Sequence, residues 1–517
     1  MPLATQPTFV PAAVPAEKAG LAHWMERVLA ECDNVHTRFA PGPVHDLRVA
    51  LRRCRSIADG LMTIDPDPSW KRMKRAGKKL FSALGNLRDS HVMTEWVEKL
   101  SAPDDEVAKA LAALAAKREV QFVQEAMAAL EAFDRKGWSA WIHILPQRAS
   151  RIGQPGLLFR HLALERWGEG YDLHRRAIRD RSQVSFHRLR IGLKRFRYIL
   201  ENFLPEWHAA WIDDLKHLQD ILGNVHDLDV LWAIAVQENV FPDPNSRQRW
   251  HNRISQERSR CIAEYRAKML GRRSLWHTWR SHLPQQAEVR KAALARLKTW
   301  ASLLDPDFRH SQRVTQFALQ LYDGLLQSGL IRPHPGDDAR LVLQVAGLAH
   351  DIGRSRGPKK HHKAGARLLR RLKPPLGLGS DHLQMAALVA RHHRGALPHT
   401  SQKAFARLTA NQRKRAGLLA GILRLADALD TEHEGIVRKV AVSHANGTIL
   451  VKASGYAPNT PLGQRVAAGR HLLEMTLARP ILVRPMDEAG DKAKASRNHR
   501  PRSHSKMSGS RSAKKAL

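Results

Sequence analysis

The chain has 517 residues, and its 85 Lys and Arg against 49 Asp and Glu give a formal net charge of +36 at pH 7. This length predicts two to four domains, and the positive charge favours a polyanionic partner such as nucleic acid, an anionic membrane or a phosphate polymer. Three isolated cysteines argue against disulfides or a cysteine zinc site, and the sequence has neither a secretory signal nor an 18-residue apolar run, so a cytoplasmic protein that does not span a membrane is expected.

The chain divides into five regions by composition and periodicity. Residues 1–20 are rich in Pro and Ala and are expected to form a flexible leader. Apolar residues recur at helical spacing over 21–285 and again over the histidine-rich stretch 286–435. Two β-type runs around an Asn-Gly pair predict a hairpin within a small α/β subdomain at 436–486, and the Ser/Lys/Arg-rich tail 487–517 is expected to be disordered. The expected fold is therefore mainly α.

The first helical stretch contains an internal repeat. The matching segments are VHDLRVALRRCRS (44–56) with FHRLRIGLKRFRY (186–198), and LFSALGNLRDSHV (80–92) with LQDILGNVHDLDV (218–230). Two repeats, about 21–150 and 151–285, are therefore expected to form two copies of one helical bundle.

Each repeat places a His and three cations at positions i, i+3, i+7 and i+10 of one helix, within an arc of roughly 80°. The first stripe is His45, Arg48, Arg52 and Arg55, and the second is His187, Arg190, Lys194 and Arg197. Like charges at this spacing repel one another, so two such stripes indicate an anion that neutralises them, and Arg suits phosphate because its planar fork binds bidentately. The alternative is that both stripes are solvated basic faces.

These doubled helices, each followed by Leu-Gly-Asn and an Asp three residues after the Asn, resemble the CHAD domain, the conserved histidine α-helical domain. The resemblance covers roughly 21–285. It implies two helical bundles that face each other across a basic pore or cleft and bind inorganic polyphosphate through the two stripes. For Asp89 and Asp227, which match the helix after each stripe, a cap or a salt bridge to the stripe is expected.

Histidine and aspartate recur at specific places in the second helical stretch. His310 begins an amphipathic helix, His350 and Asp351 end an apolar helix, and Asp427 lies within another apolar helix. Buried imidazole and carboxylate groups are costly unless they are paired or bound to metal. Three helices could bring these groups to one divalent cation, with Mg, Mn, Fe, Co and Zn all open, and such an ion could activate water to attack phosphorus.

The order H…HD…D resembles the HD phosphohydrolase superfamily. The segments GLAHDIG, HHKAGARLL, ALVARHHRGALP and LRLADALD are similar to the C-terminal HD-like region of the exopolyphosphatase/guanosine pentaphosphatase family, over about 290–435. This resemblance implies a metal site formed by His310, His350, Asp351, Asp427 and His361. It assigns catalysis to His350, Asp351, His392 and Arg394. The substrate or a second metal would contact His361, His362, His392, His393 and Arg394, whereas His399 and His433 are expected at the surface.

Three functions stay open. The first is a metal-dependent phosphohydrolase acting on polyphosphate or a related phosphoester or nucleotide. The second is a non-catalytic protein that binds polyphosphate granules and uses the HD domain as a sensor or scaffold, because the actin-like catalytic domain of the exopolyphosphatase family has no counterpart here. The third is nucleic-acid binding, which the basic tail could support weakly, although no helix-turn-helix, RNA-recognition or zinc-finger pattern is present. The oligomeric state is not determined by the sequence.

Overall fold

The computed structural model describes residues 20–153, 156–332 and 338–486. Over these ranges the chain is mainly helical, with a small three-stranded sheet near the C-terminal end, which confirms the expected fold class. Contacts divide the chain into two compact units, one running to Leu303 and including Pro375–Leu378, the other containing Leu304–Pro374 and the chain from Gly379 onward. The predicted flexible leader, apart from Gly20, and the predicted basic tail lie outside the described residues. None of the helices described is both long enough and apolar enough to cross a membrane.

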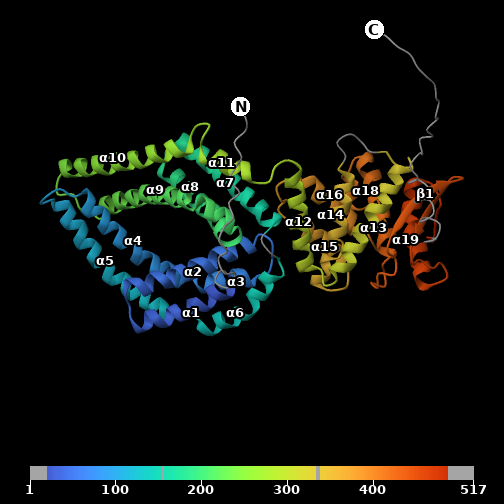
Figure 1. Ribbon diagram of the computed structural model, residues 1–517, viewed down its shortest axis with the longest axis horizontal. Helices are drawn as coiled ribbons and strands as arrows, with labels where there is room; N and C mark the ends of the chain where they lie inside the picture. The colour runs from blue at the N-terminus through green and yellow to red at the C-terminus, as the bar shows by residue number, and fades with distance from the viewer. Residues whose placement is uncertain (1–19, 154–155, 333–337, 487–517) are drawn as a thin grey trace, which may run out of the picture. The chain divides into compact units, whose positions relative to one another are not determined.

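The first unit is built from two corresponding series of helices (Figure 1). The first series is α1 (Leu21–Thr37), α2 (Pro41–Leu61), α3 (Ser69–Ala76), α4 (Lys78–Leu100), α5 (Glu106–Glu131) and α6 (Arg135–Ser150). The second is α7 (Leu157–Asp180), α8 (Gln183–Phe203), α9 (Pro205–Gln237), α10 (Pro244–Met269) and α11 (Leu275–His282). The two cation stripes lie on α2 and α8, and the two Leu-Gly-Asn segments lie on α4 and α9, as the repeat predicts.

The two series differ at one glycine. Gly77 ends α3 and begins α4, and a Cβ at this position would lie 3.3 Å from Leu51 and 3.5 Å from Trp138. The repeat aligns Leu215 with Gly77, and Leu215 lies inside the uninterrupted helix α9. The pair α3 and α4 therefore corresponds to the single helix α9.

Two apolar clusters hold the first unit together. The larger one includes Leu47 and Leu51 of α2 with Leu189 and Leu193 of α8. The smaller one joins the C-terminal halves of α4 and α9 to α5 and α10, through Trp96, Leu111, Leu228 and Trp250. Because α4 and α9 contribute to both clusters, the polar residues between the clusters on these two helices are held by apolar packing on either side.

The domain boundary expected at residue 286 differs from the contact-based division, because helix α12 (Ala287–Leu304) belongs to the first unit up to Leu303. Arg296 on α12 forms an ion pair of 2.6 Å with Glu165 on α7 and donates a hydrogen bond of 3.1 Å to the carbonyl of Thr63. These contacts tie α12 to the helices before it, a relationship that helical periodicity alone does not reveal.

The second unit contains a group of packed helices followed by the sheet. Its helices are α13 (Phe308–Gln327), α14 (Ala339–Ala349), the 3-10 helix η2 (Ile352–Arg356), α15 (His361–Arg371), α16 (Ser380–Arg391), α17 (Lys403–Ala406), α18 (Ala410–Ala428) and α19 (Pro461–Leu477). Strands β1 (Val440–Ala445) and β2 (Thr448–Ala453) form the hairpin that the Asn-Gly pair predicts, and β3 (Ile481–Pro485) adds to β2 in parallel. The apolar helix α14 is the centre of the helical group and packs against α13, α16 and α18.

Candidate functional site

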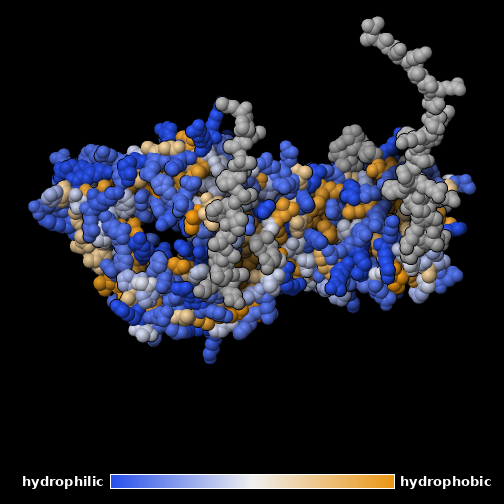
Figure 2. All heavy atoms as spheres, viewed as in Figure 1, coloured by the Kyte–Doolittle hydropathy of each residue, from blue (hydrophilic) through white to orange (hydrophobic). Residues whose placement is uncertain are grey.

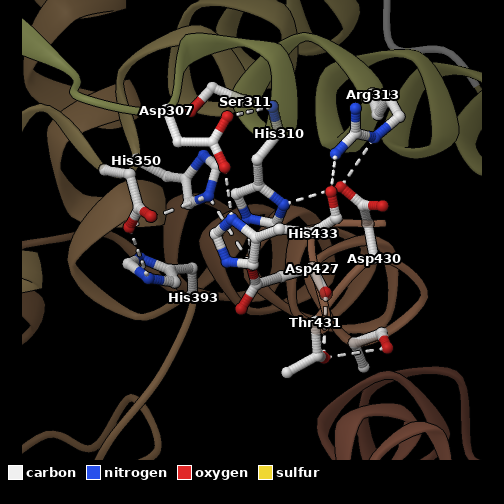
Figure 3. Close-up of polar contacts among 12 residues, drawn as sticks. Asp307, His310, Ser311, Arg313, His350, His393, Asp427, Asp430, Thr431 and His433 are labelled. Carbon is white, nitrogen blue, oxygen red and sulfur yellow. Dashed lines mark hydrogen bonds and ion pairs between the residues drawn. The ribbon is translucent and has the colours of Figure 1, made fainter. Parts of the chain in front are cut away.

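Helices α13, α14 and α18 bring His and Asp side chains to one place in the second unit (Figure 3). Asp307 caps α13 by accepting a hydrogen bond from the backbone N–H of His310, which places His310 in the first turn. Gly347 lets α14 approach α13 closely, since a Cβ there would lie 2.7 Å from the hydroxyl oxygen of Thr315. His350 follows the last residue of α14, and Asp427 lies in the last turn of α18. The candidate site is therefore fixed by the packing of three helices.

Two groups of potential metal ligands overlap at His350. In the first group, His310 Nε2 lies 3.1 Å and His350 Nε2 lies 3.6 Å from Asp427 Oδ1. The second group consists of His350, Asp351 and His393, and in each group the potential ligand atoms lie within 4.8 Å of one another. All of these side chains are buried except that of Asp427, which is 27% exposed. The two groups therefore share the imidazole of His350.

Three histidines are oriented by the same backbone interaction. His350, His361 and His393 each donate the Nδ1–H to the carbonyl oxygen three residues earlier, at 2.8, 3.0 and 2.6 Å. Each Nε2 is then directed toward Asp351 Oδ1, at 3.8, 3.0 and 3.7 Å respectively. Such outer hydrogen bonds fix the tautomer and ring orientation of histidines that bind metal.

The residues fit a divalent metal ion. The Nε2 atom of His350 is buried and has no hydrogen-bond partner among the residues described, although it faces two carboxylates. Imidazole nitrogen together with carboxylate oxygen is a donor set that suits Zn, Fe, Mn and Co. Either group could therefore hold such an ion, His310, His350 and Asp427 in the first and His350, Asp351 and His393 in the second, with His361 beside Asp351.

The electrostatics of the site favour ionised carboxylates. Burial opposes ionisation, but His350 and His361 hold the pKa of Asp351 far below its usual range. Burial likewise opposes the charged form of His310, yet hydrogen bonds to Asp427 and Asp430 raise the pKa of His310 to about 9. Burial, reinforced by the charge of His350, lowers the pKa of His393 to about 3, so this imidazole is neutral. Ionised carboxylates and neutral imidazole are the forms that bind metal, so His310 would release the proton on its Nε2 atom when an ion binds.

Of the four residues that the sequence assigned to catalysis, two lie in the ligand groups and two lie outside them. His350 and Asp351 lie in the ligand groups, whereas the side chain of His392 contacts the carbonyl of Ala396 and the ring of Phe405. Arg394 is exposed and influences His362 electrostatically. A catalytic role for His392 and Arg394 stays a prediction, and the neighbour of His392, His393, occupies the position beside Asp351.

Two residues next to His310 have roles that the sequence did not suggest. His433 was expected at the surface, but its ring stacks on His310 with centroids 3.9 Å apart, and its Nδ1 lies 2.6 Å from Asp307 Oδ2. Asp430 contacts the Nδ1 atom of His310 (Figure 3). The only available signal was the spacing of Asp430 after Asp427, which is close to one helical turn. His399 is exposed, as expected.

In the first unit, the cation stripes of α2 and α8 lie close enough to interact. Burial, followed by the charges of Arg190, Arg48 and Arg52, lowers the pKa of Lys194 to about 8. The Nε atoms of Arg52 and Arg190 are buried and lack partners among the described residues. The space-filling view shows a hollow in this part of the first unit (Figure 2). The facing stripes therefore concentrate positive charge, which the nearby carboxylates of Asp89 and Asp227 offset only in part.

The outer members of the stripes are held by other groups. Arg55 donates to the carbonyl of Lys74 at 2.8 Å, and Arg197 donates to Gln219 at 2.6 Å. His187 Nδ1 lies 3.3 Å from His226 Nδ1, whereas His45 is exposed. Among the stripe residues, Arg48, Arg52 and Arg190 are the ones whose charges act on Lys194.

The cap expected of Asp89 or Asp227 is wrong, whereas both carboxylates do act through their charges on stripe cations, Asp89 on Arg48 and Asp227 on Lys194. Both residues lie inside helices, α4 and α9, and so cap neither. Neither forms an ion pair within 4.0 Å in the part of the chain that the structure describes. Burial raises the pKa of Asp227 to about 6; the charge of Arg190 opposes this shift, and the charge of Asp89 adds to it. The two carboxylates therefore lie near each other beside the stripes.

Comparison with known families agrees with the two units. The CHAD domain model matches residues 19–236, and the HD domain model matches residues 307–432. The chain therefore carries a CHAD domain followed by an HD domain, a type of domain that depends on metal. The expected similarity to the exopolyphosphatase family stays a prediction.

Among solved structures, the crystal structure of the CHAD domain from the plant Ricinus communis matches with 22% identity and a TM-score of 0.37. The match covers 51% of this chain and 90% of that chain. No curated protein matches the sequence.

Proposed function

We propose that this chain is a metal-dependent phosphohydrolase whose CHAD domain binds inorganic polyphosphate and whose HD domain hydrolyses polyphosphate or a related phosphoester or nucleotide. The observation that carries the proposal is the buried Nε2 atom of His350, which lacks a hydrogen-bond partner among the described residues and belongs to both groups of ligands. A divalent ion in such a set supplies Lewis-acid chemistry and lowers the pKa of bound water.

Residues of the chain orient the histidines of the site and bury its ligand groups. The carbonyl contacts of His350, His361 and His393 keep each Nε2 directed inward. Burial of the ligand groups strengthens their electrostatic interaction with a divalent cation. In the hydrolysis, the oxygen of water bonds to phosphorus, the P–O bond to the leaving group breaks, and the proton of water passes to the leaving oxygen or to solvent.

Polyphosphate binding is supported by the facing stripes of α2 and α8. Four cations, Arg48, Arg52, Arg190 and Lys194, influence one another without a matching set of carboxylate ion pairs. A polyphosphate chain presents closely spaced negative charges to which Arg can bind bidentately. Linking a binding domain to a catalytic domain raises the local concentration of substrate, and association with polyphosphate granules would follow from the same binding.

Phosphate release by the full-length protein tests the proposal. Metal-analysed protein is incubated with long-chain polyphosphate and with a panel of nucleotides, and His350→Ala/Asp351→Ala is compared with the matched control His399→Ala/Asp381→Ala, which changes an exposed His and an exposed Asp. Release that is lost only in the first variant supports the phosphohydrolase. Tight polyphosphate binding without release by metal-loaded protein would instead favour a binding protein with a sensor or scaffold HD domain.

A further inference from the structure

The chain between the two carboxylates of the candidate metal centre is almost free of acidic residues. Residues 352–426, between Asp351 and Asp427, contain 17 Lys and Arg but only one acidic residue, Asp381. This segment forms η2, α15, α16, α17 and most of α18. Such an excess of one charge attracts ligands of the opposite charge. The HD domain therefore has a basic region of its own, separate in sequence from the CHAD stripes.

Three of these cations gather around the ring of His362. Lys363, Arg391 and Arg394 each act on His362 through their charges, and Lys363 and Arg394 are exposed. The centroid of the His362 ring lies 6.0 Å from that of His361 and 6.3 Å from that of His393. Lys363, Arg391 and Arg394, here named the HD cation patch, therefore border the His361 and His393 side of the metal centre.

The HD cation patch lacks the carboxylate partners found elsewhere in the second unit. Arg313, Arg340, Arg465 and Arg470 each form an ion pair with Asp or Glu. No patch residue has such a pair within the described ranges of the chain. Neighbouring unpaired cations repel one another, and a bound anion would relieve this repulsion.

The backbone beside the HD cation patch is fixed by Arg424, which engages two carbonyl oxygens that would otherwise repel an anion. Arg424 donates its Nε–H to the carbonyl of His392 at 2.7 Å and a second N–H to the carbonyl of Gly395. Gly395 adopts a φ of 75°, and a Cβ there would lie 3.3 Å from Nε2 of His362. The turn that carries Arg394 is thus fixed against His362, and two carbonyl oxygens that would repel an anion are already engaged.

We infer that the HD cation patch binds the flanking phosphates of a linear oligophosphate whose reacting phosphate lies at the metal centre. The position of the reacting phosphate rests on the proposed function, whereas the binding of the flanking phosphates rests on the patch itself. Two guanidinium groups and one ammonium group match the oxygens of consecutive phosphates. The substrate of the HD domain is therefore a chain of several phosphates rather than a simple phosphomonoester.

The test uses the full-length chain with Arg48, Arg52, Arg190 and Lys194 replaced by Ala, so that the CHAD stripes contribute little to anion binding. In this background, Lys363→Ala/Arg391→Ala/Arg394→Ala is compared with Lys439→Ala/Lys452→Ala/Arg484→Ala, which removes three exposed cations at or next to the strands. Tripolyphosphate affinity is measured by calorimetry, and metal content and helicity are checked in both variants.

Loss of the patch should weaken tripolyphosphate binding by about tenfold or more, because several charge-assisted hydrogen bonds disappear. The ratio of kcat/KM for tripolyphosphate to that for p-nitrophenyl phosphate should fall in the patch variant alone. Equal tripolyphosphate affinity in the two variants, or no binding in the starting background, would overturn the inference.

The two proposals fail in different ways. In one outcome, phosphate release requires His350 and Asp351 while the preference for tripolyphosphate over p-nitrophenyl phosphate is the same in the patch and control variants. This result would support the phosphohydrolase and contradict the role of the HD cation patch. Absence of phosphate release by every protein, with tripolyphosphate binding lost only in the patch variant, would contradict the phosphohydrolase proposal and support the patch as an oligophosphate site.

Discussion

The carboxylate of Asp430 lies 2.8 Å from Nδ1 of His310 and holds that ring in one orientation. Because an ionised carboxylate only accepts hydrogen bonds, Nδ1 keeps its proton, and Nε2 is the atom left to face Asp427. Arg313 donates to the same carboxylate at 2.8 Å, and the backbone N–H of Gly435 donates to its other oxygen at 3.1 Å. Asp430 is therefore positioned to select the tautomer of His310 that can bind metal.

Asp430→Asn should lower metal affinity by about 10- to 100-fold, the effect typical of removing a carboxylate that orients a metal-binding histidine. Calorimetric titration of metal-free protein with Zn²⁺ and with Mn²⁺ gives the affinity directly. The matched control is Asp381→Asn, at an exposed position of α16. Unchanged affinity in Asp430→Asn would show that Asp430 does not position His310 for metal.

The sequence predicts the large features of the molecule because they depend on local patterns. The repeat places the two stripes on equivalent helices, and the H…HD…D order identifies His310, His350 and Asp427, which the structure brings together. The Asn-Gly pair predicts the hairpin because positive φ at both positions suits these residues.

The remaining features depend on geometry beyond helix ends and on packing between helices. Helix α16 ends at Arg391, so the directions of His392 and His393 are set by the following turn rather than by helical periodicity. His433 follows the end of α18 and adopts a φ of 62°, which returns its ring to His310. The proximity of Asp89 to Asp227 results from the meeting of two repeats, which sequence spacing does not encode.

Polyphosphate binding should weaken as pH rises through about 8. Burial and neighbouring cations lower the pKa of Lys194 to about 8, so Lys194 is charged below this pH and increasingly neutral above it. A bound polyanion favours the charged form, which places the midpoint at or above the pKa of the free protein. Affinity for polyphosphate, measured from pH 6.5 to 9.5 at constant ionic strength, should fall by about tenfold across this range.

Two substitutions isolate the contribution of Lys194 to that pH dependence. Lys194→Arg keeps a charge at every pH used and should bind polyphosphate almost equally throughout. Lys194→Met should bind weakly and with little pH dependence. A pH dependence that persists in Lys194→Met would mean that another group is responsible.

The first unit should depend strongly on Asp65 for its stability. Asp65 is fully buried, accepts a hydrogen bond of 2.8 Å from Trp70, and receives two hydrogen bonds from Arg148, at 2.8 and 2.7 Å. Removing one partner of a buried ion pair typically costs about 3–5 kcal/mol, because the other charge loses its compensation. Asp65→Ala should therefore lower the free energy of unfolding by about this amount, as measured by urea denaturation.

Asp67→Ala serves as the matched control for Asp65→Ala. Asp67 also pairs with Arg148, at 3.2 Å, but its side chain is 24% exposed. Its removal should cost much less, since a partly exposed ion pair contributes about 1 kcal/mol or less. Equal losses of unfolding free energy in the two variants would show that the buried hydrogen bonds of Asp65 contribute no more to stability than the partly exposed ion pair of Asp67.

The two adjacent histidines after α16 should differ in their effect on bound metal. The Nε2 atom of His393 lies 3.4 Å from Nε2 of His361 and 3.7 Å from Asp351 Oδ1, whereas His392 packs near Phe405. His393→Ala should reduce the metal bound per chain, measured by elemental analysis after dialysis, and should reduce the rise in Tm that metal produces, because that rise depends on metal affinity. His392→Ala should lower Tm through lost packing while leaving metal content unchanged. Loss of metal in His392→Ala with full metal in His393→Ala would reverse the assignment and give the metal-site role to His392, which the sequence had assigned to catalysis.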